Sequence, residues 1–177
     1  MTPFSKSRTD AWVPECHLSC AADRLARVTA FVTGGAGFLL AVLWFDLMFD
    51  VQVLRHRDRN LPEAVLASVA GYYRRVTTAA RPMNRLIGAT MLATTVALGI
   101  QIARRDAPRW VGWTSLALLV SPIVLAAVRT VPSAVRLGAR TESIDHQSSR
   151  ARSICRDHLL CLGAITALLT VQLAFAR

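Results

Sequence analysis

The sequence predicts an all-α fold, an integral membrane four-helix bundle, and three observations support that class. The chain of 177 residues is 53% hydrophobic and yet carries a net charge of +10, with a mean hydropathy of +0.38, which is unusual in a soluble domain. Its apolar residues gather in four stretches that contain no Asp, Glu, Lys, Arg or His, at 28–45, 86–103, 110–128 and 159–176. These stretches are apolar on all sides, whereas the helices of a soluble bundle carry a polar face.

Each stretch, with its flanking residues, is long enough to cross a bilayer, because about 20 helical residues span about 30 Å of hydrocarbon. We therefore predict a polar N-terminal tail at 1–27 and a four-span membrane domain at 28–176. The spans themselves are expected at about 28–48, 84–103, 110–129 and 157–176. Acidic residues precede the first stretch, which favours a retained anchor over a cleavable signal.

The first loop predicts a further helix. Its segment Asn60-Leu61-Pro62-Glu63 is typical of a helix start, with Asn60 as the N-cap. The following residues place an apolar stripe on one helix face, made of Val65, Val69, Tyr72, Tyr73 and Val76. This amphipathic helix is predicted to lie at the membrane interface, and packing against the end of the bundle is the alternative.

The second half of the chain carries further local signals. Pro122 is expected to kink the third helix, and Pro132 is expected to follow that span. The third loop predicts a polar turn at 141–149. A basic helix from about Arg150 should then lead into the fourth span.

The arginines predict the orientation of the chain. With four spans, the termini and the second loop share one side and hold eight Lys and Arg, whereas the first and third loops hold thirteen Arg. The positive-inside rule puts the richer side in the cytoplasm, so both termini of this multi-pass cell-membrane protein are predicted outside. The basic loops are expected to contact anionic lipids of the inner leaflet. Nucleic acid is not expected, because no stacking aromatic residues are interleaved with the arginines.

Polar side chains within the spans predict which helix faces meet, because such groups favour the bundle interior in lipid. The helical repeat gives each span one weakly polar stripe. The stripes consist of Gly35 and Asp46 on the first span, Thr90, Thr94 and Gln101 on the second, Thr114 and Ser121 on the third, and Cys161 and Gln172 on the fourth.

The candidate site lies where the first and fourth spans meet the cytoplasmic side. Six residues there carry carboxylate, imidazole or thiol groups: Asp46, Asp50, His56, Asp157, His158 and Cys161. We take Asp46 and His158 as candidate catalytic residues, since an Asp–His pair suits proton transfer. The candidate substrate-binding residues are the nearby polar groups Thr90, Thr94 and Cys161.

Two alternatives remain open for this group of residues. The acidic residues could be solvated ends of helices that pair with Arg55, Arg57 or Arg156. A transition-metal site is the second alternative. We predict neither a metal nor a cofactor, and haem is not expected because a bis-His site needs histidines on facing helices.

The four cysteines do not form one site. Cys16 and Cys20 are separated from Cys155 and Cys161 by three spans, so the two pairs face opposite sides of the membrane. Cys155 and Cys161 are about 9 Å apart along a helix, which is too far for a disulfide. Cys16 and Cys20 are expected to be free thiols, and a bridge between them in an oxidising compartment is the alternative.

Several features of the layout occur together in one known group of proteins. The first span bears glycines, the first loop holds Tyr72-Tyr73-Arg74-Arg75, Trp110 begins the third span, and Arg156-Asp157-His158 leads into the fourth. In this layout, over 28–176, the chain resembles the anthrone-oxygenase-like family of small four-span membrane proteins. The resemblance implies cofactor-poor oxidation of a hydrophobic phenolic substrate, or a relative without enzymatic activity, and it assigns no catalytic residue.

The sequence favours a function without catalysis. It contains no Walker loop and no G-x-G-x-x-G, H-E-x-x-H or G-x-S-x-G motif. We therefore expect an accessory or interaction subunit that packs against a membrane-protein partner or against a second copy of itself. The alternative is an intramembrane enzyme that acts on a lipophilic substrate, with Asp46 and His158 as polarising or proton-moving groups.

Overall fold

A computed structural model describes residues 13–176, with side chains from residue 26 onward, and every regular element in this part of the chain is helical. In order, the helices are α1 (Val13–Asp50), the 3-10 helix η1 (Val51–Arg55), α2 (Glu63–Thr78), α3 (Arg81–Arg104), α4 (Arg109–Leu125), the π-helix η2 (Ala126–Thr130), α5 (Val131–Ala139) and α6 (Ile144–Phe175). Four segments are long and apolar enough to span a membrane: Ala26–Arg55, Arg81–Arg104, Arg109–Ala139 and Ile144–Phe175. The predicted all-α four-helix class is confirmed.

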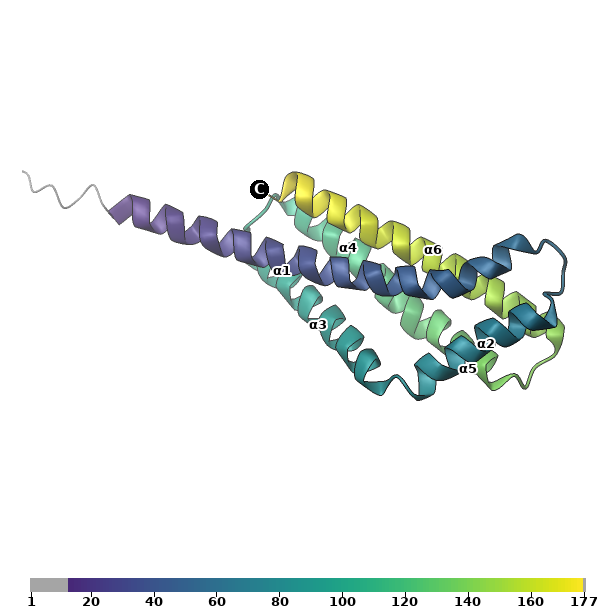
Figure 1. Cartoon of the computed structure of the whole chain (residues 1–177). Coiled ribbons are helices and arrows are strands. Elements are labelled where there is room, and N and C mark those ends of the chain that lie inside the picture. Colours follow the sequence, from purple (N-terminus) through teal and green to yellow (C-terminus); the bar gives the residue numbers. More distant parts are fainter. Residues whose placement is uncertain (1–12, 177) are drawn as a thin grey trace, which may run out of the picture.

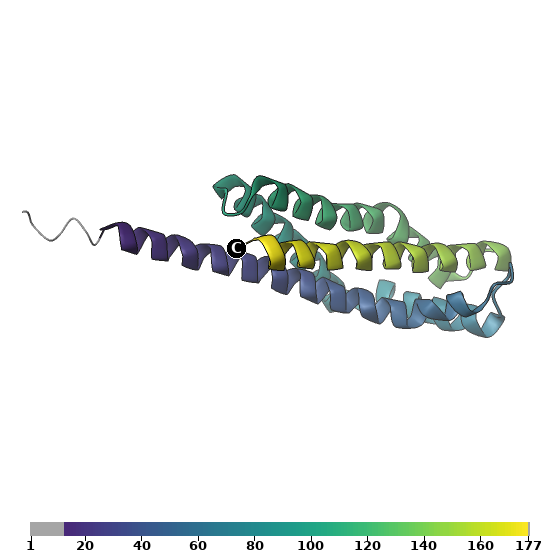
Figure 2. The ribbon, with the colours of Figure 1, turned by 90° about the horizontal axis from the view of Figure 1, so that it is seen from above.

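The four long segments form a ring in which α1 and α4 each pack against both α3 and α6. α1 lies beside α6, and its N-terminal part extends past the end of the bundle (Figures 1 and 2). The interior is a cluster of apolar side chains: Val32, Ala36, Leu39, Leu98, Leu119, Ile165 and Leu168. Much of the remaining apolar surface points outward, with Leu92 67% and Val128 75% exposed. Such a surface suits lipid rather than water, and the protein is membrane-embedded.

A second, smaller layer covers one end of the bundle, on the right in Figure 1. We call this layer the cap; it consists of η1, α2, α5 and the N-terminal part of α6. Its core contains Val53, Leu61, Leu66, Val69, Ala70, Tyr73, Ala134, Leu137, Ala151 and Ile154. Gly138 allows α5 to approach α2 closely, since a Cβ there would lie 3.0 Å from the backbone nitrogen of Arg74.

The predicted apolar stripe of the first-loop helix is the face that α2 buries. Val69 and Tyr73 are buried, and Val65, Tyr72 and Val76 are half-buried against the same core. The helix therefore packs on the end of the bundle through its apolar face.

The start of α2 differs from its prediction. Asn60 is not the N-cap, because Pro62 occupies that position with an extended backbone (φ −56°, ψ 144°). The loop before it is tied to α6, where the backbone N–H of Leu61 donates to Ser148 Oγ at 3.0 Å. A long-range contact therefore sets this helix boundary.

The start of α6 was also placed wrongly. The helix begins at Ile144, within the predicted polar turn at 141–149, rather than near Arg150. Gln147, Ser148 and Ala151 are buried in the cap, and this packing stabilises helix in a segment whose composition is typical of a turn.

The third long helical segment, Arg109–Ala139, continues beyond the predicted span and passes through both prolines. Pro122 lies inside α4, and Pro132, which follows the predicted span, lies in the first turn of α5. Between them, η2 adopts the wider π-helical turn.

Three helices are joined inside the apolar bundle by a small polar network. The side-chain amides of Gln101 and Gln172 exchange hydrogen bonds of 3.3 and 3.2 Å, and Gln172 also donates to Ser115 Oγ at 2.8 Å. The predicted stripes on the second and fourth spans thus face inward here. The stripe on the third span is wrong, because Thr114 and Ser121 are exposed and the adjacent Ser115 is the buried residue.

Gly35 sets the approach between α1 and α3. Thr94 is fully buried, and a Cβ added at Gly35 would overlap its Oγ1 atom. A Cβ added at Gly37, two residues further along α1, would meet no atom within 4 Å.

We predict that Gly35→Ala lowers the free energy of unfolding by about 1–3 kcal/mol, because the methyl group forces α1 and α3 apart. Thermal unfolding in detergent, followed by circular dichroism, measures the effect. Gly37→Ala is the matched control and should unfold close to the wild type. Equal midpoints for the two variants would contradict this packing.

Candidate functional site

The candidate site is centred on Asp50, the last residue of α1, whose side chain is fully buried. Its Oδ1 atom accepts a hydrogen bond from the Tyr73 hydroxyl at 2.7 Å, and its Oδ2 atom lies 2.6 Å from Nδ1 of His158. Tyr73 and His158 also approach each other, with 3.5 Å between the hydroxyl oxygen and Nδ1. One carboxylate thus joins α1, α2 and α6.

Local sequence explains how each of these three groups reaches the junction. Asp50 lies one turn after Asp46 at the C-terminus of α1, where the backbone carbonyls disfavour a negative charge unless donors surround it. Tyr73 comes from the buried face of α2, and His158 lies on the inner face of α6 beside the buried residue Asp157. The two donors thus offset the cost of burying the carboxylate.

A second carboxylate–phenol pair lies one helical turn earlier on α1. The Tyr72 hydroxyl donates to Asp46 Oδ1 at 2.5 Å, and both residues are partly exposed. The ring of Tyr72 stacks on Phe49 with 4.1 Å between the ring centroids. Two neighbouring tyrosines of α2 therefore bind two aspartates of α1.

Burial raises the pKa of the phenols of Tyr72 and Tyr73 far above the ordinary value, and the adjacent carboxylates raise the pKa of each phenol further. Both side chains therefore remain protonated hydrogen-bond donors. Their pKa is higher in the folded than in the unfolded chain. The stabilisation is therefore complete below about pH 10, where free tyrosine titrates, and it falls as the pH rises above that value.

We predict that absorbance near 295 nm, which reports tyrosinate, stays low in the folded protein at about pH 11, where free tyrosine is mostly ionised. The measurement is direct because Tyr72 and Tyr73 are the only tyrosines in the sequence. The same protein unfolded in denaturant is the control and should titrate normally. Normal titration of both tyrosines in the folded protein would refute the buried pairs.

A third carboxylate, Asp157, lies on the other side of His158. Its Oδ2 atom is 3.3 Å from Nε of Arg129 and 3.5 Å from the hydroxyl of Thr130, and both partners come from η2. Its Oδ1 atom is buried and has no hydrogen-bond partner among the described residues. Arg129 also donates to Ser153 Oγ at 2.7 Å.

The arginines proposed from sequence as partners of Asp46 do not fill that role. Tyr72 is the hydrogen-bond partner of Asp46, and the arginine that binds a buried carboxylate is Arg129. Arg55, Arg57 and Arg156 are exposed and make no ion pair within the described residues.

The structure brings part of the predicted site together. Asp46 and His158 lie in one cluster, connected through Tyr72, Tyr73 and Asp50. Cys161 is buried one turn beyond His158 on α6. His56 lies outside this cluster, in the loop after η1, where its backbone carbonyl accepts a hydrogen bond from Arg152 at 2.9 Å.

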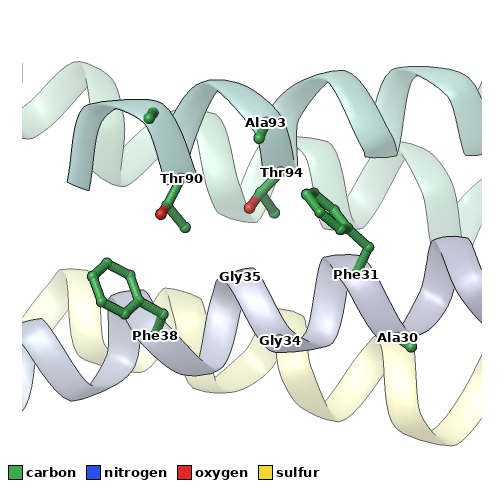
Figure 3. Close-up of a pocket in the computed structure, with 9 residues that line it drawn as sticks. Ala30, Phe31, Gly34, Gly35, Phe38, Thr90, Ala93 and Thr94 are labelled. Carbon is green, nitrogen blue, oxygen red and sulfur yellow. The ribbon is translucent and has the colours of Figure 1, made fainter. Parts of the chain in front are cut away.

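The other predicted substrate-binding residues, Thr90 and Thr94, lie elsewhere. They line an open groove of about 480 Å³ between α1 and α3, within the apolar part of the bundle (Figure 3). The remaining lining residues are small or aromatic: Ala30, Phe31, Gly34, Gly35, Phe38, Ala89 and Ala93. None of Asp46, His158 and Cys161 lines this groove. The structure thus holds two separate features where the sequence suggested one site.

Sequence reasoning placed Asp50 in the candidate site but did not include Tyr72 and Tyr73. One signal was available, because the two aspartates and the two tyrosines each lie close together on one helix. Their pairing was not available, because Tyr73 and His158 are 23 and 108 residues away from Asp50 in the chain.

The described residues contain no group of three or more His, Cys, Asp or Glu side chains placed to hold a metal ion. Cys155 and Cys161 are free thiols, as their spacing predicted. The side chains of Cys16 and Cys20, for which a disulfide was the alternative to free thiols, lie outside the described residues.

Comparisons of the chain with protein-family models, with curated proteins and with solved structures find no match. The function of this membrane protein therefore has to be argued from its own geometry. In chemical terms, the cluster around Asp50 is a closed set of hydrogen bonds that joins the bundle to the cap.

Proposed function

We propose that this membrane protein is an accessory or interaction subunit that binds a transmembrane helix of a partner protein and performs no reaction of its own. The observation that supports this proposal is that the polar cluster around Asp50 is buried and open to no ligand. Asp50 is 0%, Tyr73 3% and His158 7% exposed, and both oxygens of the carboxylate are bound within the protein. A reacting group needs access to its substrate, whereas a structural junction needs none.

The groove between α1 and α3 is the docking face in this proposal. No charged residue lines it, and it lies among the apolar turns of both helices. Gly34 is exposed in the groove, and a side chain added there would meet no atom within 4 Å. Small residues let a neighbouring helix backbone come close, which is the main source of helix association in lipid.

We predict that Gly34→Leu abolishes the association with the partner, because the larger side chain fills the groove without disturbing the fold. The measurement is quantitative proteomics of proteins that co-purify with the full chain from native membranes. Gly99→Leu is the matched control, since Gly99 is also exposed on a span, meets no atom within 4 Å and is not part of the groove.

The proposal requires a membrane protein that is enriched with the wild type and with Gly99→Leu and lost with Gly34→Leu. A partner that remains bound to Gly34→Leu would contradict the groove as the docking face. The absence of any enriched membrane protein would contradict the proposed function itself.

A second candidate function is that of an intramembrane enzyme acting on a lipophilic substrate, and the short contact between His158 and Asp50 favours it. A carboxylate 2.6 Å from an imidazole nitrogen orients the ring, as in a general acid or base. In this reading Asp46 and His158 act on a substrate that enters after α2 moves. Accumulation of one lipid-soluble compound in a deletion strain, with no partner lost, would favour the enzyme.

A further inference from the structure

Most acidic residues at the cap end of the molecule are already bound to the protein. Glu63 pairs with Arg140 at 2.7 Å and Glu142 with Arg150 at 2.5 Å, while Asp157 pairs with Arg129. Asp46 and Asp50 are bound by tyrosines and by His158. Few carboxylates are therefore left to neutralise the other arginines at this end.

Four arginines lie close together in the chain where α2 passes into α3: Arg74, Arg75, Arg81 and Arg85. All four are exposed, and no hydrogen bond or ion pair of their guanidinium groups occurs among the described residues. The whole segment 64–105 contains no Asp or Glu. We call these four residues the arginine patch.

The patch lies at the boundary between polar and lipid-facing surface. Met83 is 49% and Leu86 is 50% exposed, so apolar side chains that suit lipid begin among the last two arginines of the patch. The turn that joins the helices is fixed by Asn84, whose amide donates to the carbonyl of Val76 at 2.7 Å. The guanidinium groups thus lie beside the first exposed apolar side chains of α3.

We propose that the arginine patch binds the phosphate groups of anionic phospholipids. Charge complementarity favours lipid phosphate as the ligand, because four positive charges without an acidic partner in the described part of the chain lie beside a lipid-facing apolar surface. Guanidinium groups bind phosphate through paired N–H donors, and the long side chains reach the headgroup level from the helix surface. Each arginine near an anionic leaflet increases binding roughly fivefold at low salt.

The test is native mass spectrometry of the full chain in mixed micelles that contain equal amounts of phosphatidylglycerol and phosphatidylcholine. The wild type should retain phosphatidylglycerol in preference to phosphatidylcholine. The variant Arg74→Gln/Arg75→Gln/Arg81→Gln/Arg85→Gln should retain at least about tenfold less phosphatidylglycerol, given the contribution of each arginine. Circular dichroism checks its fold, which should persist because the replaced guanidinium groups make no hydrogen bond or ion pair among the described residues.

The control variant is Arg104→Gln/Arg105→Gln/Arg109→Gln, which removes exposed arginines from the opposite end of the bundle. It should keep the wild-type preference. An equal loss in the control variant would mean that net charge rather than the patch governs binding, and this would overturn the proposal. The proposal would also be overturned if the patch variant retained as much phosphatidylglycerol as the wild type. It would be overturned likewise if the wild type showed no preference for phosphatidylglycerol over phosphatidylcholine.

Discussion

The structure depends on the satisfaction of one buried carboxylate, that of Asp50. Burial of an unpaired carboxylate costs several kcal/mol, so the last turn of α1 is stable only with donors around it. Tyr73 and His158 supply those donors from α2 and α6. This requirement fixes the position of the cap on the bundle, because α2 has to lie where its tyrosine reaches the carboxylate. The same requirement closes the cluster to ligands, and this closure is why we favour an interaction role.

The two layers of the molecule are stabilised in different ways. The bundle offers lipid a continuous apolar surface, and its interior is held by apolar packing and the amide pair of Gln101 and Gln172. The cap has its own apolar core and adds ion pairs such as Arg140 with Glu63. The aspartates at the end of α1 connect the layers. The groove at Gly34 lies within the bundle, whereas the arginine patch lies where the cap passes into the bundle, so the two proposed binding faces consist of different residues.

The sequence was sufficient for the fold class because lipid imposes a simple rule. Backbone groups in hydrocarbon have to be satisfied within the segment, so a long uncharged stretch becomes a helix. It was insufficient wherever tertiary contacts decide. The polar segment before Arg150 is helical because Gln147 and Ser148 are buried in the cap, and packing of α4 in the bundle turns Ser115 rather than Thr114 inward. Asp50 and His158 were both expected at the cytoplasmic ends of their spans. Their direct contact was not predicted, because no local pattern records a contact across 108 residues.

Hydrogen–deuterium exchange in nanodiscs tests the junction most directly. Replacing Asp50 by Ala leaves Tyr73 and His158 without their acceptor, so amides of α2 and α5 should exchange at least tenfold faster while those within α3 keep their protection. Asp58→Ala, at an exposed position in the loop after η1, should change neither region. Unchanged protection of α2 in the Asp50→Ala protein would contradict the account, since the cap would then be held without the carboxylate.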